Sequence, residues 1–181
     1  ECYSQEGEDC ILNRIYEHQV FKDKQTGFFV DVGALHPIQF SNTYKFYKKG
    51  WRGINIDALP GSMKAFKQLR SLDVNLEVPI SNEKAVIPFY IFKENALNTF
   101  SPEIIEERDK TGSKVERVIN LETNTLSNIL DQYLPANTKI DFLTIDAEGF
   151  DFKVLQSNNW QKYRPDIVLL ESELQFLDFM N

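Results

Sequence analysis

Segments that are typical of buried strands alternate along the chain with segments of helical periodicity. FFVDVG (28–33) is a short apolar run that ends in glycine, as expected for a buried parallel strand. Apolar residues between Leu126 and Leu134 repeat at the spacing of one helical face, which predicts a helix. We therefore expect an α/β fold built on a doubly wound, mostly parallel sheet.

The remaining expected elements extend this alternation over the whole chain. Further strands are expected at 53–57, 74–80, 140–145 and 166–171. Further helices are expected at 8–19, 41–49, 63–72 and 149–157. Residues 85–92 are expected to form an antiparallel partner or hairpin arm, and residues 93–117 a polar loop with a short helix that begins at Ser101 and Pro102. Because no repeat or linker divides the sequence, residues 1–181 are expected to form a single domain, with the helix at 8–19 packed on the sheet.

The charge balance excludes several classes of partner. The 181 residues include 20 Lys+Arg and 27 Asp+Glu, which gives a formal net charge of −7. Such a chain would repel nucleic acid and anionic membranes. Its apolar runs are too short for a membrane-spanning helix, and no segment after Glu1 resembles a signal peptide. We therefore expect neither a nucleic-acid partner nor a membrane span.

Cysteine usage gives limited information on the compartment. Cys2 and Cys10 could pair, but two cysteines in a chain of this length are not a disulfide framework. With only His18 and His36 available, the spacing of a Cys/His zinc site is lacking. Reduced thiols, a cytoplasmic location and no structural metal are therefore expected.

Ligands of doubly wound sheets bind beyond the carboxyl ends of the strands, so the residues after each expected strand form the candidate site. Gly33 follows the first strand, where it would let the backbone approach a ligand closely or would only make a tight turn. Asp57 ends the second strand 24 residues later, where its two oxygens could accept hydrogen bonds from both hydroxyls of a ribose. Because the glycine-rich dinucleotide motif and the phosphate-binding loop are absent, this pair favours a nucleoside ligand.

A third group of polar residues follows the expected strand at 140–145. Asp146 and Glu148 would bring two carboxylates into the crevice, where they could act as acid and base or, with Glu171 and Glu173, hold a divalent metal ion. The alternative is that Asp146 and Glu148 cap the following helix. His36 could also take a proton, although a lone loop histidine more often only forms hydrogen bonds.

In combination, these motifs resemble a known family. The chain resembles the FkbM family of S-adenosylmethionine-dependent methyltransferases in five motifs, which occur in this order: SQEGED (4–9), FVDVGALHP (29–37), FSNTYKFYKKGWRGINIDALP (40–60), IDFLTIDAEGFD (140–151) and IVLLESE (167–173). The resemblance implies a Rossmann-like fold of the class I methyltransferase type. It also implies transfer of a methyl group from S-adenosylmethionine to a hydroxyl oxygen of a sugar, a natural product or a related small molecule.

The resemblance also implies roles for single residues. The residues expected to bind the cofactor are Gln5, Asp31, Gly33, Ala34, Asn42, Asp57, Ala58, Ser81 and Asp146. Among them, Gly33 would lie under the methionine moiety, and Asp57 would hold the ribose. The expected catalytic residues are Asp146, Glu148 and His36, one of which would remove the proton of the acceptor hydroxyl. No metal is expected in the reaction.

Members of this family continue past the position of residue 171 into two further strands, whereas this sequence stops at Asn181. We therefore expect the sheet to lack its last two strands, by truncation or by natural shortening. Two alternatives to a methyltransferase stay open. One is a non-catalytic module that binds a nucleoside or a protein partner, and the other is a nicotinamide-dependent oxidoreductase, which the missing glycines disfavour.

Overall fold

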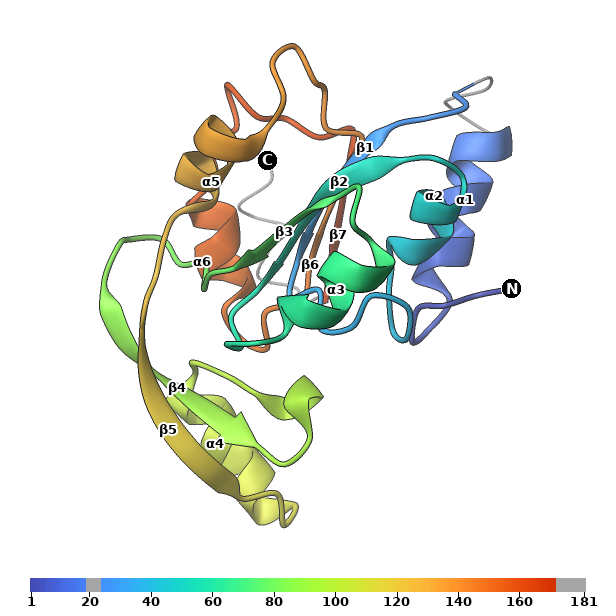
Figure 1. The fold of residues 1–181 in the computed structure, drawn as a ribbon. Helices are drawn as coiled ribbons and strands as arrows, with labels where there is room; N and C mark the ends of the chain where they lie inside the picture. The colour runs from blue at the N-terminus through green and yellow to red at the C-terminus, as the bar shows by residue number, and fades with distance from the viewer. Residues whose placement is uncertain (19–23, 172–181) are drawn as a thin grey trace.

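A five-stranded parallel sheet forms the centre of the fold. The computed structural model describes residues 1–18 and 24–171, and the strand order in the sheet is β3-β2-β1-β6-β7 (Figure 1). Its strands are β1 (Phe28–Val32), β2 (Arg52–Asp57), β3 (Val74–Glu77), β6 (Phe142–Ile145) and β7 (Ile167–Leu170). The chain runs outward from β1 to β3 and then returns to the other side of β1 with β6. This reversal creates the switch point at which doubly wound sheets bind their ligands.

Helices cover both faces of the sheet, because successive side chains of a strand point to opposite faces. The helices are α1 (Glu8–His18), α2 (Tyr44–Lys48), α3 (Met63–Leu69), α5 (Leu126–Tyr133) and α6 (Asp151–Gln156). Phe29 of β1 is buried in an aromatic cluster with side chains of α1 and α2. Val30 and Val32 belong to the core on the opposite face, which includes side chains of α5 and α6. The predicted doubly wound α/β fold is thereby confirmed.

A hairpin arm is inserted between β3 and α5. The arm consists of β4 (Val86–Phe92), a short 3-10 helix (Asn95–Leu97), α4 (Pro102–Lys110) and β5 (Val115–Glu122). Its two strands pair with each other in an antiparallel way, and Figure 1 shows the arm standing apart from the central sheet. The expectation of a hairpin arm at 85–92 is confirmed. The prediction of a polar loop at 93–117 is wrong for residues 115–117, because β5 begins at Val115.

Strand β3 is shorter than expected. The strand expected at 74–80 ends at Glu77, since Pro79 has no N–H to donate to a ladder, and Ile80 forms only an isolated bridge with Asn124. Within the described residues the sheet has five strands, and β7 lies at its edge. Glu173 and the end of the helix expected at 8–19 lie outside the described residues.

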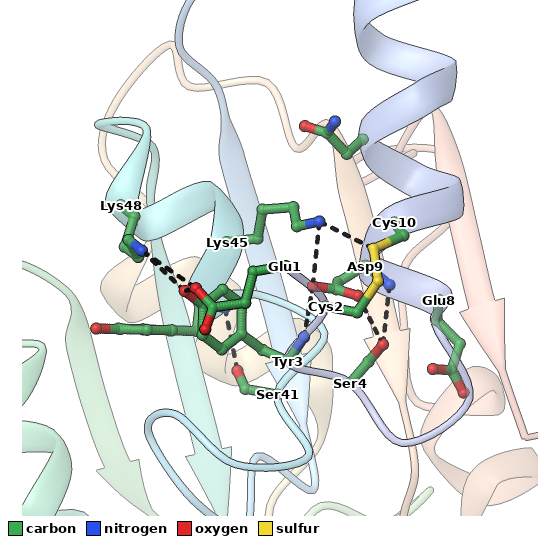
Figure 2. A network of polar contacts seen from close by, with 12 residues as sticks. Glu1, Cys2, Tyr3, Ser4, Glu8, Asp9, Cys10, Ser41, Lys45 and Lys48 are labelled. Carbon is green, nitrogen blue, oxygen red and sulfur yellow. Dashed lines mark hydrogen bonds and ion pairs between the residues drawn. A yellow bond between two sulfur atoms is a disulfide. The ribbon is translucent and has the colours of Figure 1, made fainter.

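The N-terminal segment is held by a disulfide between Cys2 and Cys10 (Figure 2). The expectation of reduced thiols is therefore wrong, whereas the expected cytoplasmic location stays a prediction. None of the helices in the described residues has the length and apolar character needed to span a membrane.

Candidate active site

A cavity of about 380 Å³ opens at the carboxyl edge of the sheet. It is lined by residues that follow β1, β2, β6 and β7, by the N-terminal segment and by Phe89 and Phe100 of the arm. Its volume lies in the range of sites that bind small molecules and cofactors. The candidate site is therefore where the strand order predicts it, between the sheet and the arm.

Most of the site residues predicted from the sequence meet in this cavity. Those that line it are Gln5, Gly33, His36, Asn42, Asp57, Ala58, Asp146 and Glu148. Three others do not line it: Asp31 and Ser81 are buried beside it, and Ala34 packs against Met63 and Phe66 of α3. Direct cofactor contacts of these three residues stay predictions.

Gly33 brings β1 and β6 together at the floor of the cavity. Its φ of 86° lies in the left-handed region, and a Cβ at this position would overlap the backbone carbonyl oxygen of Asp146. The Gly33 N–H donates to the carbonyl of Ile56 on β2 (2.9 Å). A glycine is thus required here because the 146–147 peptide approaches the backbone closely. Gly33 also lines the cavity.

Asp57 connects the loops that follow β1 and β2. Its Oδ2 accepts the N–H of Leu35 (3.1 Å), and its Oδ1 accepts the N–H of Leu59 (2.8 Å). Burial raises the pKa of Asp57, and these two N–H donors oppose that shift. Because each carboxylate oxygen accepts more than one hydrogen bond, both oxygens retain a lone pair for a ligand in the cavity.

Asp31 is buried underneath the site in a polar network on the α2 face. Its Oδ2 accepts the hydroxyl of Thr43 (2.8 Å), and that hydroxyl accepts a hydrogen bond from Nη1 of Arg70 (2.8 Å). Arg70 is fully buried and forms an ion pair with Asp73 (2.8 Å). Burial raises the pKa of Asp31 to about 6. This network fixes the turn that presents Asn42, whose Nδ2 donates to Oγ1 of Thr144 (3.0 Å).

Three carboxylates gather at the β6 and β7 end of the cavity. One oxygen from each of Asp146, Glu148 and Glu171 lies within 4.8 Å of the other two. Asp146 is exposed to the open cavity, yet protein atoms surround its carboxylate closely. This desolvation, together with the charges of Glu171 and Glu148, raises the pKa of Asp146 to about 8. A carboxyl group with such a pKa can exchange a proton near neutral pH.

Glu148 is held by the arm and is less available than Asp146. Arg108 of α4 forms an ion pair with its carboxylate, and the Thr99 hydroxyl donates to its backbone carbonyl (2.7 Å). Burial raises the pKa of Glu148, and the charge of Arg108 opposes that shift. The alternative that Asp146 and Glu148 cap α6 is wrong. The N-cap residue of α6 is Phe150, which forms no side-chain cap bond, and the carboxylate of Asp151 accepts the N–H groups of Ala147 (3.1 Å) and Gly149 (3.2 Å) in the loop before the helix.

His36 organises the loop after β1. Its Nδ1 accepts the N–H groups of Ile38 (3.2 Å) and Gln39 (3.0 Å). With Nδ1 used as an acceptor, the proton of the neutral ring is on Nε2, so neither nitrogen is free to take another proton while these bonds persist. The geometry therefore favours Asp146 over His36 as a proton acceptor.

Sequence reasoning missed several residues of the site. Arg108, Thr99 and Phe100 come from the arm, far along the chain from the motifs, and no local pattern indicates their position. Thr144 could have been predicted, because it lies on β6 two residues before Asp146, which follows that strand.

Comparison with known protein families matches residues 31–181 to the methyltransferase FkbM domain. Comparisons with curated proteins and with solved structures found no match. The match covers most of the chain, and it agrees with the parallel sheet and the cavity at its carboxyl edge. The chain therefore belongs to the FkbM family and is an S-adenosylmethionine-dependent methyltransferase.

Proposed function

We propose that this protein transfers the methyl group of S-adenosylmethionine to a hydroxyl oxygen of a small molecule or saccharide. The observation that carries the O-methylation part is the position of Asp146 in the cavity, where one of its carboxylate oxygens lies within 4.8 Å of oxygens of Glu148 and Glu171. This carboxyl group faces the cavity, and its pKa is raised to about 8 by desolvation and by two neighbouring carboxylates. A hydroxyl acceptor loses a proton on methylation, and such a group is suited to receive it.

The residues present fit the cofactor. Asp57 offers a free lone pair on each oxygen for the two ribose hydroxyls, and Ala58, Leu59 and Ile80 supply apolar surface beside it for the adenine. Gly33 lines the cavity, and its turn would lie under the methionine moiety. The carboxyl groups of Asp146, Glu148 and Glu171 lie together in the cavity, where negative charge would attract the sulfonium cation of the cofactor.

When bound, S-adenosylmethionine supplies an electrophilic methyl group. The protein contributes position, since holding the hydroxyl in line with that methyl makes the reaction effectively unimolecular. Asp146 accepts the hydroxyl proton on its carboxylate, and Arg108 keeps Glu148 engaged with the arm. The apolar side chains Phe89 and Phe100 help to exclude water.

The alternatives make different demands on the same cavity. A nicotinamide-dependent enzyme needs room for a pyrophosphate at the first strand turn, and here the acidic residues Asp57 and Asp146 lie near that turn. A non-catalytic module would bind the nucleoside without turnover.

The experiment is a transfer assay with methyl-labelled S-adenosylmethionine and a panel of neutral polyols, saccharides and phenols. We expect label in at least one hydroxyl compound and release of one S-adenosylhomocysteine per methyl. Asp146→Asn is expected to lose transfer and to retain S-adenosylhomocysteine binding. Binding of S-adenosylhomocysteine without transfer to any panel member would favour the non-catalytic module.

A further inference from the structure

Phe40 is a large apolar side chain exposed at the cavity. It is 59% exposed, which places it among six exposed large hydrophobic residues in the part of the chain that the structure describes. Of those six, Phe40 alone lines the cavity. An aromatic side chain left open in a ligand site offers apolar surface that a ligand can cover.

The backbone holds Phe40 in an unfavourable conformation. Its φ is 54°, in the left-handed region that residues other than glycine rarely adopt. Among the described residues, four non-glycine residues have positive φ, and three of them, Leu35, Phe40 and Glu148, line the cavity. Such conformations persist where the surrounding structure enforces them, and they concentrate at functional sites.

The contacts on both sides of Phe40 enforce its position. On one side, the His36 ring accepts the N–H groups of Ile38 and Gln39. On the other side, the N–H of Ser41 donates to the carbonyl of Tyr3 (3.2 Å), and Oγ of Ser41 accepts the N–H of Tyr44 (3.1 Å).

Tyr3 is itself fixed by the N-terminal loop (Figure 2). The disulfide between Cys2 and Cys10 closes this loop, and the buried carboxylate of Asp9 accepts the N–H of Tyr3 (2.9 Å) and the hydroxyl of Ser4 (2.8 Å). The loop thus braces the turn that carries Phe40, and Gln5 from the same loop lines the cavity beside it.

The turn that carries Phe40 is bonded to β6, the strand that precedes the proposed base. The proposed ribose and adenine contacts follow β2 and β3, on one side of β1. The turn of Phe40 is joined to the other side, because Asn42 donates to Thr144 of β6, two residues before Asp146. This bond connects the turn that carries Phe40 to the strand that precedes the proposed base.

We propose that Phe40 is a specificity-determining residue that stacks on an apolar face of the acceptor, such as the C–H face of a pyranose ring. The assignment rests on the proposed O-methyltransferase function. The strained turn supplies preorganisation, because the ring is already in place before the acceptor binds. Asp146 then meets a hydroxyl on the edge of the stacked ring.

The test compares Phe40→Ala and Phe40→Trp with the wild type, using the methyl pyranosides of glucose, galactose, mannose and rhamnose as acceptors. For the best pyranoside, Phe40→Ala is expected to raise KM about tenfold or more, because the ligand loses the apolar area that it covers. Phe40→Trp is expected to retain most of the affinity. Both variants are expected to bind S-adenosylhomocysteine like the wild type and to keep its melting temperature, since alanine at this φ is strained much as phenylalanine is.

Leu72→Ala is the matched control, because Leu72 is 63% exposed and lies outside the cavity. It should change neither KM nor cofactor affinity. An unchanged KM in Phe40→Ala would overturn the assignment, and so would an equal loss of S-adenosylhomocysteine affinity, which would place Phe40 on the cofactor. A wild type that binds S-adenosylhomocysteine and labels no pyranoside would overturn the proposed acceptor face, whereas a wild type that does not bind it would refute the proposed function itself.

Discussion

Removal of the Asp57 carboxylate should separate cofactor binding from structural support. In Asp57→Ala, the ribose loses two hydrogen-bond acceptors, and the N–H groups of Leu35 and Leu59 lose theirs. Asp57→Asn keeps one acceptor oxygen at nearly the same volume. Comparison of the two variants therefore shows how cofactor affinity depends on the number of acceptor oxygens at position 57.

The magnitude follows from these contacts. Each hydrogen bond to a charged acceptor contributes roughly 1.5–3 kcal/mol, and water that enters the cavity recovers part of it. We expect Asp57→Ala to lower the affinity for S-adenosylhomocysteine by roughly tenfold to a few hundredfold, with Asp57→Asn in between. The free energy of unfolding should fall by about 1 kcal/mol, because water can reach the two freed N–H groups. Because burial raises the pKa of Asp57, its charge destabilises the folded protein. Removing this charge therefore offsets part of the stability that is lost with the two hydrogen bonds.

The assay pairs isothermal calorimetry with urea unfolding on each variant. Asp141→Asn is the control, because Asp141 also accepts a backbone N–H, that of Phe28 (2.7 Å), at the opposite edge of the sheet. It should lower stability and leave cofactor affinity unchanged. If Asp57→Ala showed the same result as this control, the ribose assignment would be refuted.

Three further perturbations test the rest of the site. The transfer rate of the wild type should rise as the pH passes about 8, because Asp146 must lose its proton to act as a base. Asp146→Asn should lose most of this rate, and any residual rate should not rise over the same pH range; a residual rate with the same rise would assign the titration to another group. Gly33→Ala should lower the free energy of unfolding by roughly 3 kcal/mol or more, because the new Cβ would overlap the Asp146 carbonyl oxygen. Gly112→Ala is the control and should cost only about 1–2 kcal/mol, because Gly112 also has a positive φ (90°) but no atom lies near its Cβ position. Equal losses for the two variants in urea unfolding would contradict the close approach of the 146–147 peptide to Gly33. Addition of EDTA should leave the transfer rate unchanged, because Arg108 already pairs with Glu148, and a loss that Mg²⁺ restores would show that the three carboxylates hold a metal.

The centre of the sheet could be predicted from the sequence because the inner strands β1, β2 and β6 are largely buried on both faces. Such strands are continuous apolar runs, as in 28–33 and 140–145, and they are distinct from amphipathic helices. Strand β5 was missed since only one of its faces is covered: Ile119 and Leu121 pack inward, while Val118 is 50% exposed. Apolar and polar residues do alternate along β5, but many charged residues lie in and before it, so the segment resembles a polar loop.

The site could be predicted only as far as the strand ends. Gly33, Asp57 and Asp146 follow from the rule that ligands bind at the carboxyl edge. The burial of Asp31 away from the cavity follows from strand alternation, because Asp31 shares a face with Phe29, and that face lies under α2. The pairing of Arg108 with Glu148 depends on how the arm lies against the loop that follows β6. No local pattern specifies that contact, and none specifies the disulfide that braces Phe40.

The central claim is that the cavity binds the nucleoside of S-adenosylmethionine, and calorimetric titration of the protein with S-adenosylhomocysteine tests it most directly. We expect one site per chain with a Kd of about micromolar strength, which corresponds to roughly 8 kcal/mol of binding free energy, and no heat with NADH at the same concentrations. Binding of NADH, or no heat and no shift in melting temperature with S-adenosylhomocysteine, would contradict it.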